Sequence, residues 1–192
     1  MSAMFQLCKE LEYLDLSSFD TSNIKEMPLM FEGCKTLKII QGLNQFITNK
    51  VNNMKGMFQS CSEIEYLDLS SFDTSNVIDM SGMFNKCYKL MEIKGINKFV
   101  TNKVITMNAM FGNCHGLQCL DLSNFDTSNV TDFQGMFFGD KNLGYLNLLN
   151  FTIHGNTSKM FSYRQLSNCQ LITNNEELLK IFKSTDLSCI IF

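Results

Sequence analysis

The sequence has one proline, no tryptophan and two histidines among its 192 residues. Neither His115 nor His154 lies in a motif typical of a nucleophile or a metal site, and no glycine-rich phosphate-binding loop is present. No apolar run approaches the roughly 18 to 20 residues that a membrane span needs. With 16 basic and 19 acidic residues, a net charge of −3 argues against a protein that binds nucleic acid through phosphate contacts. We therefore expect a non-enzymatic protein with no cofactor, no metal, no membrane span and no nucleic-acid partner.

The N-terminus also lacks the features of a secretory signal. Such a signal needs a basic start, an apolar core of about 7 to 15 residues and a cleavage site of small residues. Residues 1–8 are Met-Ser-Ala-Met-Phe-Gln-Leu-Cys and do not follow that order. We expect a chain that genuinely starts at Met1 to stay in the cytoplasm.

Three residue types are abundant instead, with 17 phenylalanines, 13 methionines and 8 cysteines. An internal repeat accounts for them, because the pair Met-Phe recurs at intervals of 26, 27, 26, 27, 26 and 24 residues. The pairs begin at Met4, Met30, Met57, Met83, Met110, Met136 and Met160. A cysteine follows each of the first five pairs, at Cys8, Cys34, Cys61, Cys87 and Cys114.

A second motif, Leu-Asp-Leu-Ser-x-Phe-Asp-Thr-Ser-Asn, starts at Leu14, Leu67 and Leu120, so that 26-residue units alternate with 27-residue units. Its first residues alternate apolar and polar side chains, which predicts a short half-buried strand. The stretch Met-x-x-Met-Phe-x-x-Cys has apolar residues at i, i+3, i+4 and i+7, which predicts one or two helical turns. Because no unit buries its apolar edge alone, each unit is interpreted as one coil of a solenoid.

Two segments inside the unit carry turn signals. The 27-residue units contain an extra residue, and we expect Gly42 and Gly95 to form β-bulges that absorb it. The Asp-Thr-Ser-Asn segment has short polar side chains that bond nearby backbone amides. Its aspartates, Asp20, Asp73 and Asp126, could alternatively ligate calcium, but the units between them carry an apolar residue at that place. We therefore predict that these aspartates cap turns.

The chain divides into an array over residues 1–150 and a divergent C-terminal part over residues 151–192. The C-terminal part is predicted to hold a degenerate last coil and a cap, with an amphipathic helix over 174–183. The apolar tail, Cys189–Phe192, is expected to be packed. At the other end, residues 1–5 align with the middle of a unit, so we expect the first coil to be incomplete. That coil suggests the alternative function, a structural element that associates through its N-terminal edge, for instance as a homodimer.

The unit Leu-Asp-Leu-Ser-x-Phe-Asp-Thr-Ser-Asn-Val…Met-x-x-Met-Phe-x-x-Cys resembles the 26-residue repeat of the BspA-like leucine-rich repeat surface proteins. The match covers about residues 1 to 150. The resemblance implies an α/β leucine-rich-repeat solenoid of about six coils, with a parallel sheet on one side and short helical turns opposite. It also implies an adhesin or surface antigen that binds proteins, matrix or cells, located at the cell surface or secreted.

The cysteine ladder places one sulfur in each of the first five coils, which fits stacked buried thiols that pack as small hydrophobes. A disulfide among some of them and a metal site are the alternatives. Only Cys114, His115 and Cys119 have spacings that approach a zinc motif. Cys119 falls at an outward strand position and is therefore the thiol that we expect to react most readily.

The outward face of the predicted sheet is the candidate binding site. One row holds Tyr13, Ile39, Tyr66, Glu92, Cys119 and Tyr145. A second row holds Asp15, Gln41, Asp68, Lys94, Asp121 and Asn147. Tyrosine beside aspartate or lysine is typical of protein-recognition surfaces, although strands favour tyrosine in any case. The predicted function is a protein-binding module of the adhesion type.

Overall fold

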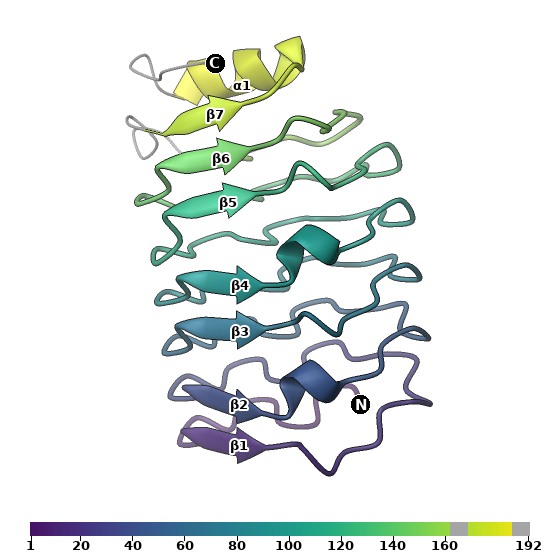
Figure 1. Cartoon of the computed structure of the whole chain (residues 1–192). Helices are drawn as coiled ribbons and strands as arrows, with labels where there is room; N and C mark the ends of the chain where they lie inside the picture. The colour runs from purple at the N-terminus through teal and green to yellow at the C-terminus, as the bar shows by residue number, and fades with distance from the viewer. Residues whose placement is uncertain (162–168, 186–192) are drawn as a thin grey trace.

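Each repeat unit contributes one three-residue strand to the same side of a solenoid (Figure 1). The structure is a computed structural model, which describes residues 1–161 and 169–185. Its strands are β1 (Tyr13–Asp15), β2 (Ile39–Gln41), β3 (Tyr66–Asp68), β4 (Glu92–Lys94), β5 (Cys119–Asp121), β6 (Tyr145–Asn147) and β7 (Gln170–Ile172). The strand positions and the parallel pairing confirm the predicted solenoid fold.

The strands do not form one continuous sheet. They pair in parallel as β1–β2, β3–β4 and β5–β6–β7, with each first residue level with the first residue of the next strand. The intervals from β2 to β3 and from β4 to β5 are visibly wider than the others (Figure 1). The face that carries the predicted binding rows is thus divided into three blocks.

The divisions follow the extra residue of the 27-residue units. It lengthens the connection after the strand into a 3₁₀ helix, η1 (Leu43–Gln45) or η2 (Ile96–Lys98). Gly42 and Gly95 precede these helices with φ of 80° and 90°, a left-handed conformation that suits glycine. The prediction of β-bulges at these two glycines is therefore wrong, because the extra residue winds into a helical turn outside the ladder.

The shorter units show what the 3₁₀ helix replaces. After β1, the Leu16 amide donates a hydrogen bond of 2.9 Å to the Gln41 carbonyl and so extends the ladder to the next coil. The Leu69 amide does the same to the Lys94 carbonyl. No hydrogen bond between the described main chains continues the ladder from β2 to β3.

The Met-Phe segments form a second ladder, which has no such divisions. They are tight turns rather than regular helices, with positive φ at residues such as Leu29 and Gly33. Alternate amides donate to carbonyls of the following coil: Leu29 to Lys55, Phe31 to Met57 and Gly33 to Gln59, at 2.8 to 2.9 Å. The same one-way pattern recurs along the stack, and isolated bridges link neighbouring coils beside it from Glu26 to Asn156.

The core between the two ladders consists of columns of identical residues. Phenylalanine rings stack with centroids 5.4 to 5.9 Å apart along Phe31, Phe58, Phe84, Phe111 and Phe137. Each column contains one member per coil, so burial of each ring depends on the coils above and below it. The abundance of phenylalanine and methionine is therefore explained by packing.

At the positions of the predicted cysteine ladder, Cys34, Cys61, Cys87 and Cys114 are fully buried. Each thiol donates to a phenylalanine carbonyl of the preceding coil at 3.0 to 3.1 Å, as in the contact of Cys87 with Phe58. Cys8 differs, because it lies in the first described coil, where no described coil precedes it. Its side chain is exposed. The prediction that it belongs to the buried ladder is wrong for that residue.

The Asp-Thr-Ser-Asn segments form the predicted turns. The carboxylates of Asp20, Asp73 and Asp126 accept hydrogen bonds of 2.9 to 3.0 Å from the amides two residues later. The threonine that follows each of them is buried and joins adjacent coils; Thr74 Oγ1, for example, donates to the Val100 carbonyl and accepts from the Val100 amide. The aspartates thus serve as turn caps.

The C-terminal helix α1 (Glu176–Thr185) confirms the predicted helical cap. The Asn175 side chain accepts hydrogen bonds from the amides of Glu177 and Leu178, which caps the helix N-terminus. Leu178 and Phe182 are buried, and the Phe182 ring packs edge-on against Phe161. The predicted packing of Cys189–Phe192 lies outside the described residues. In the described part of the chain, no helix has the length and hydrophobicity to cross a membrane.

Candidate binding face

The strands carry both predicted rows. The first and third residue of each strand point outward, and the second points into the core, where Leu67, Ile93 and Leu120 are buried. Large apolar side chains remain exposed in the first row, with 49% of Tyr13, 58% of Ile39 and 47% of Tyr66 accessible. Exposed aromatic and aliphatic side chains on a fixed backbone are available for contact with another molecule.

Within each block, the side chains of neighbouring strands hold one another in place. The Tyr13 hydroxyl donates a hydrogen bond of 2.7 Å to Gln41 Oε1, from β1 to β2. In the second block, Lys94 Nζ lies 2.9 Å from Asp68 Oδ2, from β4 to β3. Each of these two contacts joins strands of the same block, and neither crosses the β2–β3 interval.

Asp68 is the most strongly perturbed carboxyl group of the rows. The pKa of Asp68 is lowered to about 2, mainly because the Ser70 hydroxyl donates a hydrogen bond to its carboxylate. Hydrogen bonds from Lys94 and from the Ser70 amide lower this pKa further. The pKa of Asp15 is also lowered, by the Ser17 side chain and amide, and that of Asp121 by the Ser123 amide. The second row therefore carries fixed negative charge at neutral pH.

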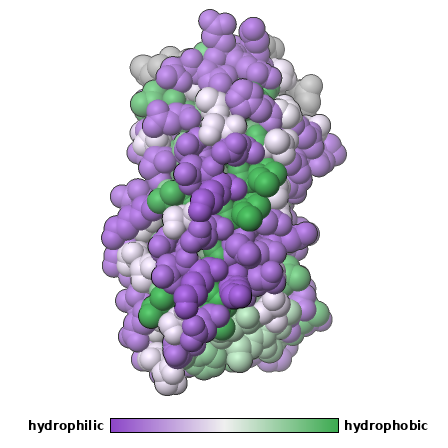
Figure 2. Space-filling model, turned by 90° about the vertical axis from the view of Figure 1, so that its right-hand side faces the viewer, coloured by the Kyte–Doolittle hydropathy of each residue, from purple (hydrophilic) through white to green (hydrophobic). Residues whose placement is uncertain are grey.

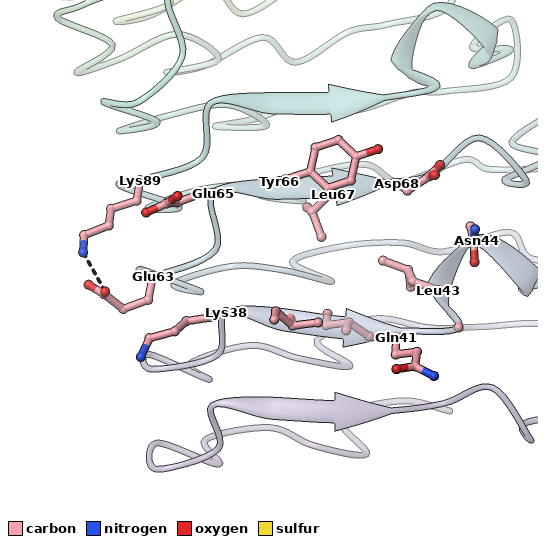
Figure 3. A pocket seen from close by; sticks show the side chains of 13 residues that line it. Lys38, Gln41, Leu43, Asn44, Glu63, Glu65, Tyr66, Leu67, Asp68 and Lys89 are labelled. Atoms are coloured by element: carbon pink, nitrogen blue, oxygen red, sulfur yellow. Dashed lines mark hydrogen bonds and ion pairs between the residues drawn. The ribbon is translucent and has the colours of Figure 1, made fainter.

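The β2–β3 interval is open to solvent as a groove of about 750 Å³ (Figure 3). The nearly buried side chains of Leu67 of β3 and Leu43 of η1 line its bottom, and Lys89 and Glu63 form an ion pair of 2.6 Å at one end. Ile40, the inward residue of β2, is only half-buried, whereas its counterpart Ile93 in β4 is 6% exposed. The groove therefore opens onto apolar side chains.

The side on which the chain leaves the strands is mostly hydrophilic, with small separate hydrophobic patches (Figure 2).

Among the described residues, no three His, Cys, Asp or Glu side chains lie close enough to hold a metal ion. In the zinc-like sequence motif, the Cys114 thiol bonds the Phe84 carbonyl and the His115 ring stacks on Tyr88. Cys119 is exposed on β5, at an outward position of the strand.

Burial raises the pKa of the ladder thiols, to about 11 for Cys34 and about 12 for Cys87. These cysteines are therefore held in the protonated form, which is neither the nucleophilic nor the metal-binding form of the side chain.

Two features of the site were missed at the level of sequence. The groove follows from the 27-residue units, whose extra residue was visible but was assigned to a bulge. Asp140 occupies the cysteine position of the sixth unit and is buried, with one oxygen accepting from the Cys114 amide and the other without a partner in the described part of the chain. Burial raises its pKa well above the usual value. The only sequence signal was a carboxylate at the repeat position where each of the first five units has a cysteine.

The profile of the family described as "Mycoplasma protein of unknown function, DUF285" matches residues 1–94 and 61–175. The chain belongs to the DUF285 family. The two overlapping matches cover the predicted array and β7, so the DUF285 assignment extends over all seven strands. Curated proteins provide no match to the sequence.

A solved structure is similar to this DUF285 chain. It is the 1.19 Å crystal structure of a leucine-rich repeat protein from Bacteroides ovatus ATCC 8483, at 14% sequence identity and a TM-score of 0.38. The match covers 90% of this chain, which spans 58% of the length of that protein.

Proposed function

We propose that this DUF285 chain is a non-catalytic binding module that recognises a partner protein through the outward face of its strands. The observation that carries the proposal is the exposure of Tyr13, Ile39 and Tyr66 beside the charged second row. The strands that hold these residues are fixed by parallel pairing with the strand of a neighbouring coil. Rigid aromatic side chains supply contact area at low entropic cost, and adjacent charges supply specificity. A solenoid adds stiffness, because every coil is bonded to its neighbours.

The resemblance to BspA-like surface proteins supports an adhesion-type role for this module. In that role the partner is a protein outside the cell, and recognition requires surface complementarity without any chemical step. The arrangement of the second row agrees with such a role, since its aspartates cap turns, as Asp15 and Asp121 do, and Asp68 also pairs with Lys94.

The test uses a phage-displayed library of natural protein fragments selected on the immobilised chain. Selected fragments are then measured against a variant carrying Tyr66→Ala and Asp68→Ala, which we expect to weaken binding at least tenfold, because truncation of central interface residues costs about 2 kcal/mol or more. Tyr88→Ala is the matched control, since Tyr88 is 40% exposed but lies outside the strands. Equal affinity of the folded double variant and the parent chain would contradict the proposal.

A second candidate is self-association through the first coil. Met4 and Leu7 are 52% and 55% exposed there, and Phe5, Leu11 and Leu14 are only partly covered. A second copy that packed against this edge would bury these side chains. Light scattering over a hundredfold range of concentration tests this: a dimer that Leu7→Lys dissociates supports it, and a monomer at every concentration excludes it.

A further inference from the structure

The groove between β2 and β3 is bordered by two strand edges that do not pair with each other. On its far side β2 bonds β1: the Ile39 amide donates to the Glu12 carbonyl and the Gln41 carbonyl accepts from the Leu16 amide. Residues of a strand in a parallel sheet bond alternately to one neighbour and the other. The amide and carbonyl of Ile40, which lies between these two residues, therefore face the groove.

The same reasoning applies to β3. Its outer bonds go to β4, where the Glu65 carbonyl accepts from the Glu92 amide and the Leu69 amide donates to the Lys94 carbonyl. The amides and carbonyls of residues 65, 67 and 69 thus form the hydrogen bonds to β4, whereas the amides and carbonyls of Tyr66 and Asp68 face the groove. Both edges present alternating main-chain donors and acceptors, the pattern that an added strand satisfies.

The side chains around these groups also match an extended peptide. Ile40, Leu43 and Leu67 line the groove with apolar side chains, of which Ile40 is half-buried. Ile39 and Tyr66 also line it and are 58% and 47% exposed. Figure 3 shows Leu43, Tyr66 and Leu67 on its two sides. Side chains of a strand alternate between the two faces, so a peptide in the groove would turn one side chain onto this apolar lining and its neighbours outward.

The charged side chains around the groove determine which peptide side chains would be complementary to it. Lys38 pairs with Glu12, Lys89 with Glu63, and Asp68 with Lys94. Glu65 also lines the groove and is exposed, and it forms no ion pair with a described residue. A basic side chain of the ligand would complement it.

We infer that the groove between β2 and β3 binds an extended segment of a partner protein as an added strand, with an apolar side chain against the apolar lining and a basic side chain beside Glu65. This inference rests on the proposed function and specifies the form of its partner. The groove is large enough for such a segment, since ligand sites commonly measure about 300 to 1,000 Å³.

The second division, between β4 and β5, serves as an internal comparison. It has the same interrupted ladder, but Ile93 is buried there, and Gln118 and Cys119 replace Glu65 and Tyr66. It therefore lacks the acidic group and the aromatic rim of the β2–β3 groove, while its half-buried apolar residue is Ile96 of η2 instead of Ile40.

The experiment begins with selection of a phage-displayed random heptapeptide library on the full chain, without any assumption about the natural partner. The enriched peptides are synthesised, and their affinities are measured by fluorescence anisotropy. We expect alternating apolar residues with a lysine or arginine. N-methylation of a central backbone amide should weaken binding about tenfold, while N-methylation of a terminal amide should not.

Amide exchange measured by NMR locates the peptide without any substitution in the protein. Bound peptide should slow exchange of the Ile40, Tyr66 and Asp68 amides by roughly tenfold or more, and leave the Leu67 amide, already bonded to β4, unchanged. A variant in which residues 42–45 are replaced by Leu-Ser-Ser, the connection found after β1, should close the groove and abolish binding. The exchange result decides the matter if that variant does not fold.

The possible outcomes separate this inference from the proposed function. Absence of enriched peptides, insensitivity to central N-methylation, or unchanged exchange at Ile40 and Tyr66 would overturn the inference. If protein fragments still depend on Tyr66 and Asp68 in that case, the proposed function stands alone. Slowed exchange caused by raising the protein concentration without peptide would identify a second copy as the occupant and would also overturn it.

Discussion

The two long sides of the solenoid differ in how main-chain hydrogen bonds join neighbouring coils. On the Met-Phe side, each turn bonds the next coil, and the ladder runs through every described coil. On the strand side, the ladder stops after β2 and again after β4. Both sides belong to the same coils, so the difference arises within the repeat unit itself.

The difference comes from one residue in every second unit. The extra residue lies after the strand, where η1 and η2 absorb it, and the Met-Phe side keeps its register. Buried columns of phenylalanine and cysteine hold that side together. The comparison indicates that the Met-Phe side provides stability, while the strand side is free to expose strand edges and side chains.

The largest effect is expected from breaking the Met-Phe side. Phe84→Ala removes a fully buried ring stacked between Phe58 and Phe111, and should lower the free energy of unfolding by about 3 to 5 kcal/mol. Tyr66→Ala on the strand side should cost less than about 1 kcal/mol, since that ring is 47% exposed. Urea denaturation measures both, and similar losses would show that the two sides do not differ as described.

The next effect concerns the glycine that makes the strand side discontinuous. Gly95→Ala should destabilise the fold by about 1 to 3 kcal/mol, because φ is +90° and the new Cβ would lie 2.6 Å from Ser70 Cα. Gly144→Ala is the control, since its nearest contact would be 3.7 Å from the Gln118 carbonyl oxygen. Thermal unfolding of both variants tests this, and a Gly95→Ala variant as stable as the control would contradict it.

A smaller, pH-dependent effect is expected at Asp140, the polar member of the Met-Phe side. Its pKa is raised by burial, so the folded protein keeps the proton that the unfolded chain releases near pH 4. Stability should therefore fall as pH rises from about 4 toward the raised pKa, by up to about 1.4 kcal/mol per pH unit.

Asp140→Asn should remove this part of the pH dependence, as measured by urea denaturation at pH 5 and pH 8. Asp126→Asn is the control, because the Ser128 side chain and amide lower the pKa of that carboxyl and its contribution is lost only in acid. The same slope for Asp140→Asn and the parent chain would show that the buried carboxyl is not the cause.

The smallest effect is expected on the strand side at the pair formed by Lys94 and Asp68. Lys94→Ala should change the free energy of unfolding by less than about 1 kcal/mol, because the lysine side chain is 54% exposed. NMR titration should show that Ser70→Ala raises the pKa of Asp68 more than Lys94→Ala does, since Ser70 is the main cause of its lowering. The reverse order would assign the charge of this row to the ion pair instead.

The repeat made most of the fold predictable. Identical residues at a fixed period had to occupy equivalent positions, so Tyr13, Ile39 and Tyr66 could be assigned to one row, and Cys61 and Cys87 to one buried column. What could not be predicted was how the extra residue of the 27-residue units is accommodated. A bulge and a 3₁₀ turn both suit Gly42, because glycine adopts the left-handed conformation that either can require, so the residues after the strand do not distinguish them.

The one-way hydrogen bonds of the Met-Phe side give the stack a polarity. Amides point toward later coils and carbonyls toward earlier ones, so the first coil shows the carbonyls of Ser2, Met4 and Gln6, to which no described residue donates. An edge made only of acceptors cannot bond to an identical edge. Two copies therefore cannot join their Met-Phe ladders head to head, and any segment that extends the ladder there must offer a row of amides, as every coil does toward the next.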